Sequence, residues 1–315
     1  MKENTDTQIN VLVVDDIHPI FMTMLDDGRF NIDYRPDINY QEALQIIGTY
    51  EVLIIRSKFK VEKEIIERAG KLRVIARAGS GVDNINGVLA TAHGISLVSA
   101  PEGNCDSVAE HMTGMLLALL HRIPRGNAQV RNQVWDREGN RGVELGGKTV
   151  GLIGYGNNGK AMARKLAGFN VSVLAYDKYL LGFSDAYVTE SSIARITREA
   201  DVLSFHVPLT QETRGWVNEG FLNAFEKPFY FLNGSRGEVV EVPALMQALK
   251  SGKVLGAALD VLQVEKFPSL SEMSWYPELC SMEQVILTPH VAGWSVESYK
   301  KIAVVLAEKV LALYV

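Results

Sequence analysis

Three polar side chains that could do chemistry follow three short apolar runs in the second half of the chain. Arg236 comes after FYFLNG, Glu265 after GAALDV and His290 after VILTP. A guanidinium can hold a carboxylate through paired, charge-assisted hydrogen bonds and can polarise a neighbouring carbonyl. A histidine can move a hydroxyl proton, and a carboxylate beside it favours the protonated ring. This set of residue types suits hydride transfer between a hydroxy acid and a nicotinamide.

Each of these residues, taken singly, also has a simpler explanation. Arg236 could be a surface turn residue, Glu265 a solvated loop acid and His290 a histidine near a helix start. All three, however, follow predicted parallel strands, and open α/β sheets bind their ligands at the carboxyl ends of such strands. We therefore predict that Arg236, Glu265 and His290 are catalytic.

A glycine-rich stretch upstream predicts where a cofactor binds. Gly154, Gly156 and Gly159 have the G-x-G-x-x-G spacing, directly after an apolar run and directly before a helical stretch. The first glycine permits a tight turn, the second lets a pyrophosphate approach the backbone, and the third allows close packing. Asp177, 21 residues after Gly156, could accept hydrogen bonds from the adenosine ribose. Because Asp177 would repel a 2′-phosphate, NAD is favoured over NADP, a preference that the adjacent Lys178 tempers slightly.

The elements that must position these residues alternate along the chain. Helical stretches separate short β-branched runs, a pattern that builds parallel sheets through right-handed crossovers. The first series of predicted strands is INVLVVD, FNIDYR, VLIIRS, RVIARAG and ISLVSA, and the second is KTVGLIGYG, VSVLAYD, DVLSFHVP, FYFLNG, VLGAALDV and VILTPH. We therefore predict an α/β protein with two doubly wound parallel-sheet domains.

Two helices are predicted at the junctions of these series. Ser107 and Glu110 have capping-box spacing at the start of SVAEHMTGMLLALLHRI, which we expect to lead into the second domain. The last stretch, from residue 295, places apolar side chains on one helical stripe: Val296, Tyr299, Ile302, Leu306, Val310 and Leu313.

Composition limits the classes of function. The 315 residues are 47% hydrophobic and 22% charged, with a net charge of −5, which argues against a nucleic-acid or anionic-membrane surface spread over the molecule. The N-terminal MKENTDTQ is polar and lacks the apolar core of a signal peptide, and MTGMLLALL is too short to cross a bilayer. We expect a soluble, cytoplasmic protein that binds a small molecule, with no membrane or nucleic-acid partner and no metal site.

The chain resembles the D-isomer-specific 2-hydroxyacid dehydrogenases over nearly its whole length. The resemblance rests on RAGSGVDNI, NCDSVAEHMTGMLLALLHRIP, GKTVGLIGYGNNG, ADVLSFHVPLTQETRGWVN, NGSRGEVVEVPALMQALKSGKVLGAALDV and LTPHVAG. It implies a Rossmann NAD-binding domain (107–291) inserted into a flavodoxin-like substrate domain (1–106 and 292–315). It also implies an active site between the domains and a homodimer or higher homo-oligomer.

The resemblance also implies roles for individual residues. Arg236 would bind the substrate carboxylate and carbonyl, His290 would be the acid/base and Glu265 its partner. Backbone of the RAGSG loop would help to hold the substrate at Ala78, Gly79 and Ser80. Together with the glycine motif, the resemblance assigns NAD binding to Gly154, Gly156, Asn157, Asn158, Gly159, Asp177, Val207, Pro208, Gly234, Ser235, Asp260 and Ser80.

Within the family the chain is most similar to the members that act on D-3-phosphoglycerate. In those members arginines at the places of Arg56 and Arg77 help to bind the substrate phosphate, and two arginines at strand ends suit an extra dianion. The alternative is that both pair with nearby acids. Other open possibilities are hydroxypyruvate, glyoxylate or erythronate 4-phosphate as substrate, or an NAD(H)-sensing binding protein like the C-terminal-binding corepressors.

The chain departs from the family pattern after its Asp-containing strand. The usual E-x-E-P is here QVEKFP, with Gln263 and Lys266 in place of an acid and a proline, so the loop around Glu265 is expected to differ in shape. Gly234 and Gly237 flank Arg236, and we expect them to give room to nicotinamide and substrate. The chain ends soon after the last predicted helix, so we expect no C-terminal regulatory domain.

Overall fold

The computed structural model describes residues 8–314, which form two compact units. Unit 1 contains the described residues up to Asn104 together with those from Trp294 onward, and unit 2 runs from Cys105 to Gly293. Unit 2 therefore interrupts unit 1 in sequence. Except for Gln8, the polar N-terminal stretch discussed above lies outside the described residues.

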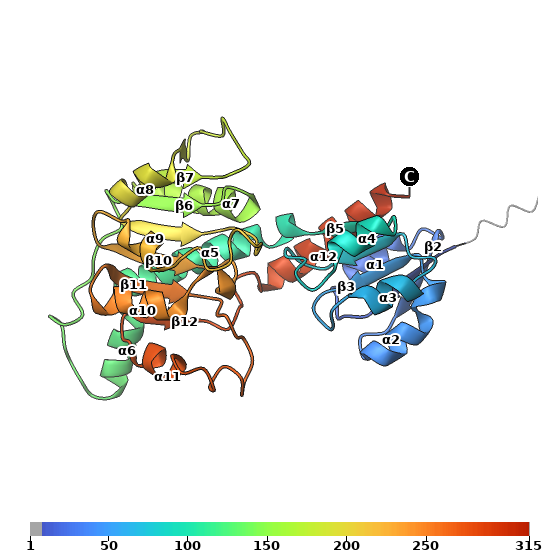
Figure 1. Ribbon diagram of the computed structural model, residues 1–315, viewed down its shortest axis with the longest axis horizontal. Helices are drawn as coiled ribbons and strands as arrows, with labels where there is room; N and C mark the ends of the chain where they lie inside the picture. The colour runs from blue at the N-terminus through green and yellow to red at the C-terminus, as the bar shows by residue number, and fades with distance from the viewer. Residues whose placement is uncertain (1–7, 315) are drawn as a thin grey trace, which may run out of the picture. The chain divides into compact units, whose positions relative to one another are not determined.

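Unit 1 is built around a five-stranded parallel sheet with the order β2-β1-β3-β4-β5 (Figure 1). Its strands are β1 (Ile9–Val13), β2 (Phe30–Tyr34), β3 (Val52–Ile55), β4 (Val74–Arg77) and β5 (Ser96–Ser99). Its helices are α1 (Ile20–Leu25), α2 (Tyr40–Ile46), α3 (Lys63–Arg68), α4 (Gly87–Ala92) and α12 (Val296–Ala312), with the 3-10 turns η1 (Ile47–Thr49) and η2 (Pro101–Gly103).

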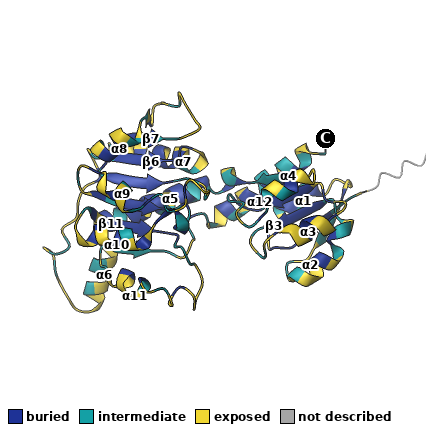
Figure 2. Ribbon diagram, viewed as in Figure 1, coloured by how far each residue is buried: buried dark blue, intermediate teal, exposed yellow. Residues whose placement is uncertain are grey.

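Alternation along the strands of unit 1 explains why helices cover both faces of its sheet. In β1 and directly after it, Val11 and Val13 pack on one face, while Leu12 and Val14 pack on the other. The first face is covered by α1 and α12, and the second by α2, α3 and α4. All four side chains are fully buried, which explains why the sequence of this strand is a continuous apolar run. Figure 2 shows the buried strands lying between helices that have exposed outer faces.

Unit 2 contains a seven-stranded sheet in which every paired strand is parallel, with the order β12-β11-β10-β9-β6-β7-β8 (Figure 1). Its strands are β6 (Thr149–Ile153), β7 (Ser172–Tyr176), β8 (Thr189–Glu190), β9 (Val202–Phe205), β10 (Phe229–Asn233), β11 (Val254–Leu259) and β12 (Val285–Leu287). Its helices are α5 (Cys105–Leu120), α6 (Ile123–Arg131), α7 (Asn157–Leu166), α8 (Ile193–Glu199), α9 (Glu219–Asn223), α10 (Val242–Lys250) and α11 (Tyr276–Ser281), with η3 (Ala167–Phe169) and η4 (Gly237–Val239).

The strand order of unit 2 reverses between β6 and β9, which makes the carboxyl ends of these two strands a topological switch point. One face of the sheet packs against α5 and α7, and the other packs against α8, α9 and α10. The predicted fold class, α/β with two doubly wound parallel-sheet domains, is confirmed. Each of the eleven predicted strands is present, whereas the two-residue β8 and helix α6 were not predicted.

Both predicted junction helices exist, but each differs from expectation in detail. Helix α5 begins at Cys105, so Ser107 lies inside it and the predicted capping box is wrong. The Ser107 hydroxyl instead donates to the carbonyl of Ala292 at 2.7 Å. In α12, Ile302, Leu306 and Val310 are buried as predicted, but Val296 and Leu313 are exposed. These two residues lie in the first turn and at the C-cap, beyond the part of the helix that packs on the sheet.

None of the helices in the described part of the chain is long and apolar enough to cross a membrane.

A close backbone contact inside unit 1 yields a stability prediction. A Cβ added at Gly103 would lie 2.6 Å from both Cα and N of Ile302, because η2 crosses α12 at that point. Gly103→Ala must therefore displace α12, and we expect it to lower the free energy of unfolding by about 1–3 kcal/mol. Urea denaturation followed by circular dichroism measures the loss.

A second glycine provides the matched control. Gly114 lies on the exposed side of α5, and a Cβ there would meet nothing within 4 Å. Gly114→Ala should therefore raise the free energy of unfolding by about 0.5–1 kcal/mol, since alanine favours the helix. Equal stabilities of Gly103→Ala and the wild type would mean that the α12 crossing is not tight.

Candidate active site

The three predicted catalytic residues follow three neighbouring strands of the unit 2 sheet. Arg236 comes after β10, Glu265 after β11 and His290 after β12, and these strands are consecutive in the sheet. Because the strands are parallel, their carboxyl ends lie at one edge, which is where the three loops begin. The structure thus brings the three loops to one edge of one sheet.

Glu265 and His290 are in direct contact. Nδ1 of His290 donates to Oε2 of Glu265 at 2.8 Å, and both side chains are partly exposed. A carboxylate accepts but does not donate, so Nδ1 carries the proton and Nε2 is the ring nitrogen left for another group. His290 has a φ of 55°, in the left-handed region that non-glycine residues rarely adopt. Such strain, held in place by surrounding bonds, is a frequent feature of functional sites.

Asp260, at the end of β11, holds the loop that carries His290. Its side chain is 1% exposed. Its carboxylate accepts the N–H groups of Val291 and Ala292, each at 2.9 Å, and the hydroxyl of Thr288 at 2.6 Å. Its backbone carbonyl accepts the N–H of His290 at 2.8 Å. These bonds show that the Asp260 carboxylate holds the loop that carries His290, while its contact with NAD stays a prediction.

Helix α5 supports the same loop with residues that the sequence did not reveal as functional. Nε2 of His111 lies 3.1 Å from the Thr288 hydroxyl, which accepts because its own proton points to Asp260. Ser107, one turn earlier, holds the carbonyl of Ala292. No local motif in the sequence identifies this pair, because the two residues are 177 positions apart.

Asn233, at the end of β10, organises the Arg236 loop. Its side chain is fully buried, donates to the carbonyl of Arg236 at 2.9 Å and accepts from the backbone and hydroxyl of Ser235. The Asn233 carbonyl in turn accepts the N–H of Asp260 at 3.0 Å. Arg236 itself is partly buried and donates from Nη1 to the carbonyl of Ser235 at 2.7 Å. A chain of hydrogen bonds therefore links the arginine loop to the histidine loop.

The glycines that flank Arg236 allow other parts of the protein to pack closely against their backbone. A Cβ at Gly237 would lie 1.9 Å from the backbone carbon of Leu262, and one at Gly234 would lie 2.7 Å from the sulfur of Met112. These contacts do not fit the expectation that the two glycines leave space for nicotinamide and substrate. The close approach at Gly237 instead fixes the Arg236 loop against the loop that carries Glu265.

The departure from the family pattern after β11 has a structural counterpart. The side chain of Gln263 donates to the carbonyl of Val240 at 3.0 Å, which ties the Glu265 loop to the end of η4. Lys266, which stands where the family usually has a proline, is exposed, and Glu265 beside it remains in contact with His290. The altered sequence therefore preserves the pairing of Glu265 with His290.

The glycine loop after β6 has the features of a phosphate cradle. Gly154 has a φ of +94°, and a Cβ there would lie 2.6 Å from the carbonyl oxygen of His206. A Cβ at Gly159 would lie 2.2 Å from the carbonyl of Gly154, whereas one at Gly156 would meet nothing within 4 Å. Neighbouring atoms therefore pack closely against Gly154 and Gly159, whereas the space beside Gly156 is open. A pyrophosphate that approaches the backbone needs such an open space at the second glycine.

The start of α7 also fits a nucleotide. The helix begins at Asn157 with Gly156 as its N-cap, and no side chain caps it, so its first N–H groups can receive phosphate oxygens. Oδ1 of Asn158 is buried without a hydrogen-bond partner. These observations fit the predicted cofactor site, in which NAD would lie against the glycine loop and the helix start.

Asp177 lies where the motif places it, at the end of β7. Oδ2 accepts the N–H of Tyr155 at 2.8 Å, and Oδ1 accepts the N–H groups of Tyr179 and Leu180 at 2.9 and 3.1 Å. The carboxylate thus joins the glycine loop to the turn after β7. Oδ2 keeps acceptor capacity that a ribose hydroxyl could use.

His206 follows β9 on the other side of the switch point. Its Nδ1 is buried without a partner, and its Nε2 lies 3.0 Å from the Ser204 hydroxyl. Burial lowers the pKa of His206 to about 4, so the ring is neutral near pH 7. Val207 and Pro208, the next two residues, are partly buried and exposed.

The predicted substrate residues of unit 1 follow β3 and β4. Arg56 stacks its guanidinium over the Trp294 ring at 4.4 Å, and none of the described acids forms an ion pair with it. Asp15, at the end of β1, fixes the loop by accepting the N–H of Arg56 at 2.6 Å and those of the next two residues. The guanidinium of Arg77 lies against Gly79, because a Cβ there would be 1.6 Å from Nη1. Ala78 and Gly79 are buried, and Ser80 is partly exposed.

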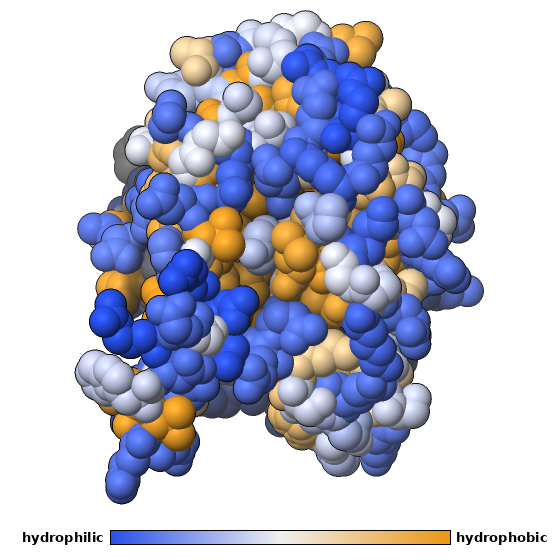
Figure 3. Space-filling model, turned by 90° about the vertical axis from the view of Figure 1, so that its left-hand side faces the viewer, coloured by the Kyte–Doolittle hydropathy of each residue, from blue (hydrophilic) through white to orange (hydrophobic). Residues whose placement is uncertain are grey.

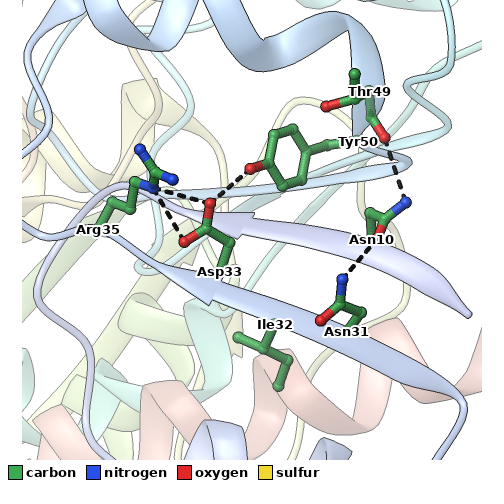
Figure 4. Close-up of a pocket in the computed structure, with 7 residues that line it drawn as sticks. All are labelled: Asn10, Asn31, Ile32, Asp33, Arg35, Thr49 and Tyr50. Carbon is green, nitrogen blue, oxygen red and sulfur yellow. Dashed lines mark hydrogen bonds and ion pairs between the residues drawn. The ribbon is translucent and has the colours of Figure 1, made fainter.

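A cavity of about 450 Å³ lies elsewhere on unit 1 (Figure 4). Its polar side chains pair with one another: Asp33 accepts from Arg35 and from the hydroxyl of Tyr50, and Asn31 donates to Asn10. None of the predicted site residues lines this cavity. Among residues 8–314, no three His, Cys, Asp or Glu side chains gather in a way that could hold a metal ion.

Comparisons with known proteins agree with this geometry. Residues 113–292 match the NAD binding domain of the D-isomer specific 2-hydroxyacid dehydrogenases, so the predicted cofactor, NAD, is the ligand for which the matched domain is named. A D-3-phosphoglycerate dehydrogenase of Methanocaldococcus jannaschii is 34% identical over 96% of this chain and 57% of its own length. The chain thus spans little more than half of that relative.

A hydroxypyruvate reductase of Thermotoga maritima is 35% identical over 85% of this chain and 86% of its own length. Among solved structures, a D-lactate dehydrogenase of Aquifex aeolicus, complexed with NAD and lactic acid, superposes with a TM-score of 0.82. It is 26% identical and covers 97% of this chain and 95% of its own. The chain belongs to the D-isomer-specific 2-hydroxyacid dehydrogenase family.

Proposed function

We propose that the protein transfers hydride between NAD(H) and a D-2-hydroxy acid or its 2-oxo acid. The observation that carries the proposal is the Glu265–His290 pair at 2.8 Å, which leaves Nε2 of the histidine for a substrate. The pair shares a sheet edge with the Arg236 loop in a chain whose family uses this chemistry. The proposal includes the predicted boundaries of the two domains and the predicted roles of the individual residues.

Three side chains perform the proposed reaction. The Arg236 guanidinium holds the substrate carboxylate and the neighbouring oxygen through charge-assisted hydrogen bonds. During oxidation, Nε2 of His290 takes the proton of the substrate hydroxyl, and during reduction it returns that proton to the carbonyl oxygen. Glu265 holds Nδ1–H and stabilises the imidazolium that forms. Bound NAD supplies the nicotinamide that accepts or donates the hydride.

We propose 3-phosphoglycerate and 3-phosphohydroxypyruvate as the first substrate pair, which would place the reaction in serine biosynthesis. Support comes from the similarity to D-3-phosphoglycerate dehydrogenases and from Arg56, whose guanidinium stacks on Trp294 and forms no ion pair with a described acid. Hydroxypyruvate is the second candidate, because the Thermotoga maritima reductase matches this chain over most of both sequences.

We also propose a cytoplasmic homodimer that forms through unit 2. Ile123, Val130 and Trp135 are large apolar side chains that are 56, 54 and 80% exposed on α6 and the segment after it. Figure 3 shows apolar side chains gathered near the middle of one face of the molecule, between hydrophilic ones. Exposed apolar side chains of this size are typical of surfaces that a partner covers.

Removing the Arg236 guanidinium tests the reaction class. We expect Arg236→Ala to lower kcat/KM for 2-oxo acids by about a hundredfold or more, because the carboxylate loses its paired hydrogen bonds. The affinity for NADH should change little. The measurements are nicotinamide absorbance with 3-phosphohydroxypyruvate, hydroxypyruvate, glyoxylate and 2-oxoglutarate, and NADH fluorescence titration for binding. Arg198→Ala, an exposed arginine paired with Glu199 on α8, is the control.

The wild-type protein itself can contradict the proposal. Tight NADH binding without turnover of any 2-oxo acid would favour an NAD(H)-sensing binding protein over an enzyme.

The phosphate assignment has its own test. We expect Arg56→Ala and Arg77→Ala each to raise the KM for 3-phosphohydroxypyruvate by about tenfold and to leave the KM for hydroxypyruvate within about twofold, because only the former carries a dianion. Steady-state kinetics on both substrates measures the difference. Arg68→Ala, an exposed arginine in the last turn of α3, serves as control. An equal rise for both substrates would assign the arginines to general substrate binding or to stability.

A further inference from the structure

The turn after β7 contains an ion pair beside the residue that would meet the adenosine ribose. Lys178 directly follows Asp177, and its Nζ lies 2.5 Å from Oε2 of Glu212. The same carboxylate oxygen accepts the hydroxyl of Tyr179 at 3.2 Å. The pKa of Glu212 is lowered by its hydrogen bond to Lys178, and the pKa of Lys178 is raised by the same bond. All three side chains are exposed.

Glu212 reaches Lys178 from the other side of the topological switch point. It lies in the loop that leaves β9, whereas Lys178 lies in the loop that leaves β7. The β9 loop is a tight turn, because the Thr213 hydroxyl donates to the carbonyl of Pro208 at 2.7 Å and the N–H of Thr210 donates to the same hydroxyl at 2.8 Å. Thr213 is buried, so the turn presents Glu212 from a fixed base.

This arrangement controls the charge that an adenosine ribose would meet. Asp177 and Glu212 are acids and Lys178 is a base, so together they carry one net negative charge. Lys178 alone would attract a 2′-phosphate, which is a dianion. With Glu212 in contact, its charge is already neutralised, and the repulsion from Asp177 remains.

We infer that Glu212 sets the preference for NAD over NADP by holding Lys178 away from the 2′ position of the cofactor. Lys178 could bind a 2′-phosphate if it were released from this ion pair. Glu212 is thus the specificity-determining residue, because it keeps Lys178 in the pair. The inference rests on the proposed use of NAD(H) at the glycine loop, but not on the identity of the hydroxy acid.

Binding of NADH and NADPH to the purified full chain tests the inference, with the fluorescence of each reduced cofactor as the signal. We expect Glu212→Gln to bring the two dissociation constants closer by about fivefold, the effect of an exposed ion pair, mainly through tighter NADPH binding. Raising the salt concentration should shrink this gain, since exposed charges are screened. In Glu212→Gln with Lys178→Ala, the ratio should return to the wild-type value or beyond.

Glu199→Gln is the matched control, because Glu199 is also an exposed, ion-paired acid of unit 2, held by Arg195 and Arg198. It makes the same change in net charge and should leave the ratio unchanged. An unchanged ratio in Glu212→Gln, or an equal gain in NADPH affinity when Lys178 is also removed, would overturn the inference while the proposed reaction stands. Normal cofactor selectivity without turnover of any 2-oxo acid would instead overturn the proposed reaction alone. If neither NADH nor NADPH binds the wild type, both the inference and the proposed reaction are contradicted.

Discussion

The carboxylate of Asp260 is the interaction on which the catalytic edge of unit 2 depends. A buried acid is costly unless donors surround it. Here three donors come from the segment around His290, and Nε2 of His111 on α5 lies 3.6 Å from Oδ1 of Asp260. These bonds hold the segment in an arrangement in which the Asp260 carboxylate is satisfied and His290 has a φ of 55°. The stability of the fold and the geometry of the acid/base group are thus set by the same bonds.

The same edge shows why three loops from distant parts of the sequence act as one site. The side-chain amide of Asn233 donates to the Arg236 carbonyl. The backbone N–H of Asp260 donates to the Asn233 carbonyl, and that of His290 donates to the Asp260 carbonyl. The parallel pairing of β10, β11 and β12 sets the distances between the three loops, independently of the side-chain conformations. The functional side chains then need only extend from positions that the sheet has already fixed.

Much of this could be predicted because the signals are local. Strands buried on both faces read as apolar runs, and the glycine spacing before α7 with Asp177 after β7 identifies a nucleotide turn without a structure. The predicted capping role of Ser107 was wrong, and Val296, placed on the apolar stripe of the last helix, is exposed, because helix ends depend on the packing around them. The contacts of His111 and of Glu212 join residues far apart in sequence, and no local pattern identifies such partners.

The backbone contact between Gly237 and Leu262 also limits how far the loop that carries Glu265 can move. Leu262 is held at that point, and Glu265 follows only three residues later, so the short span between them sets the reach of the acid. Gln263 lies within this span and Lys266 directly follows the acid, so the chain departs from the usual sequence on both sides of Glu265 and still keeps it in contact with His290.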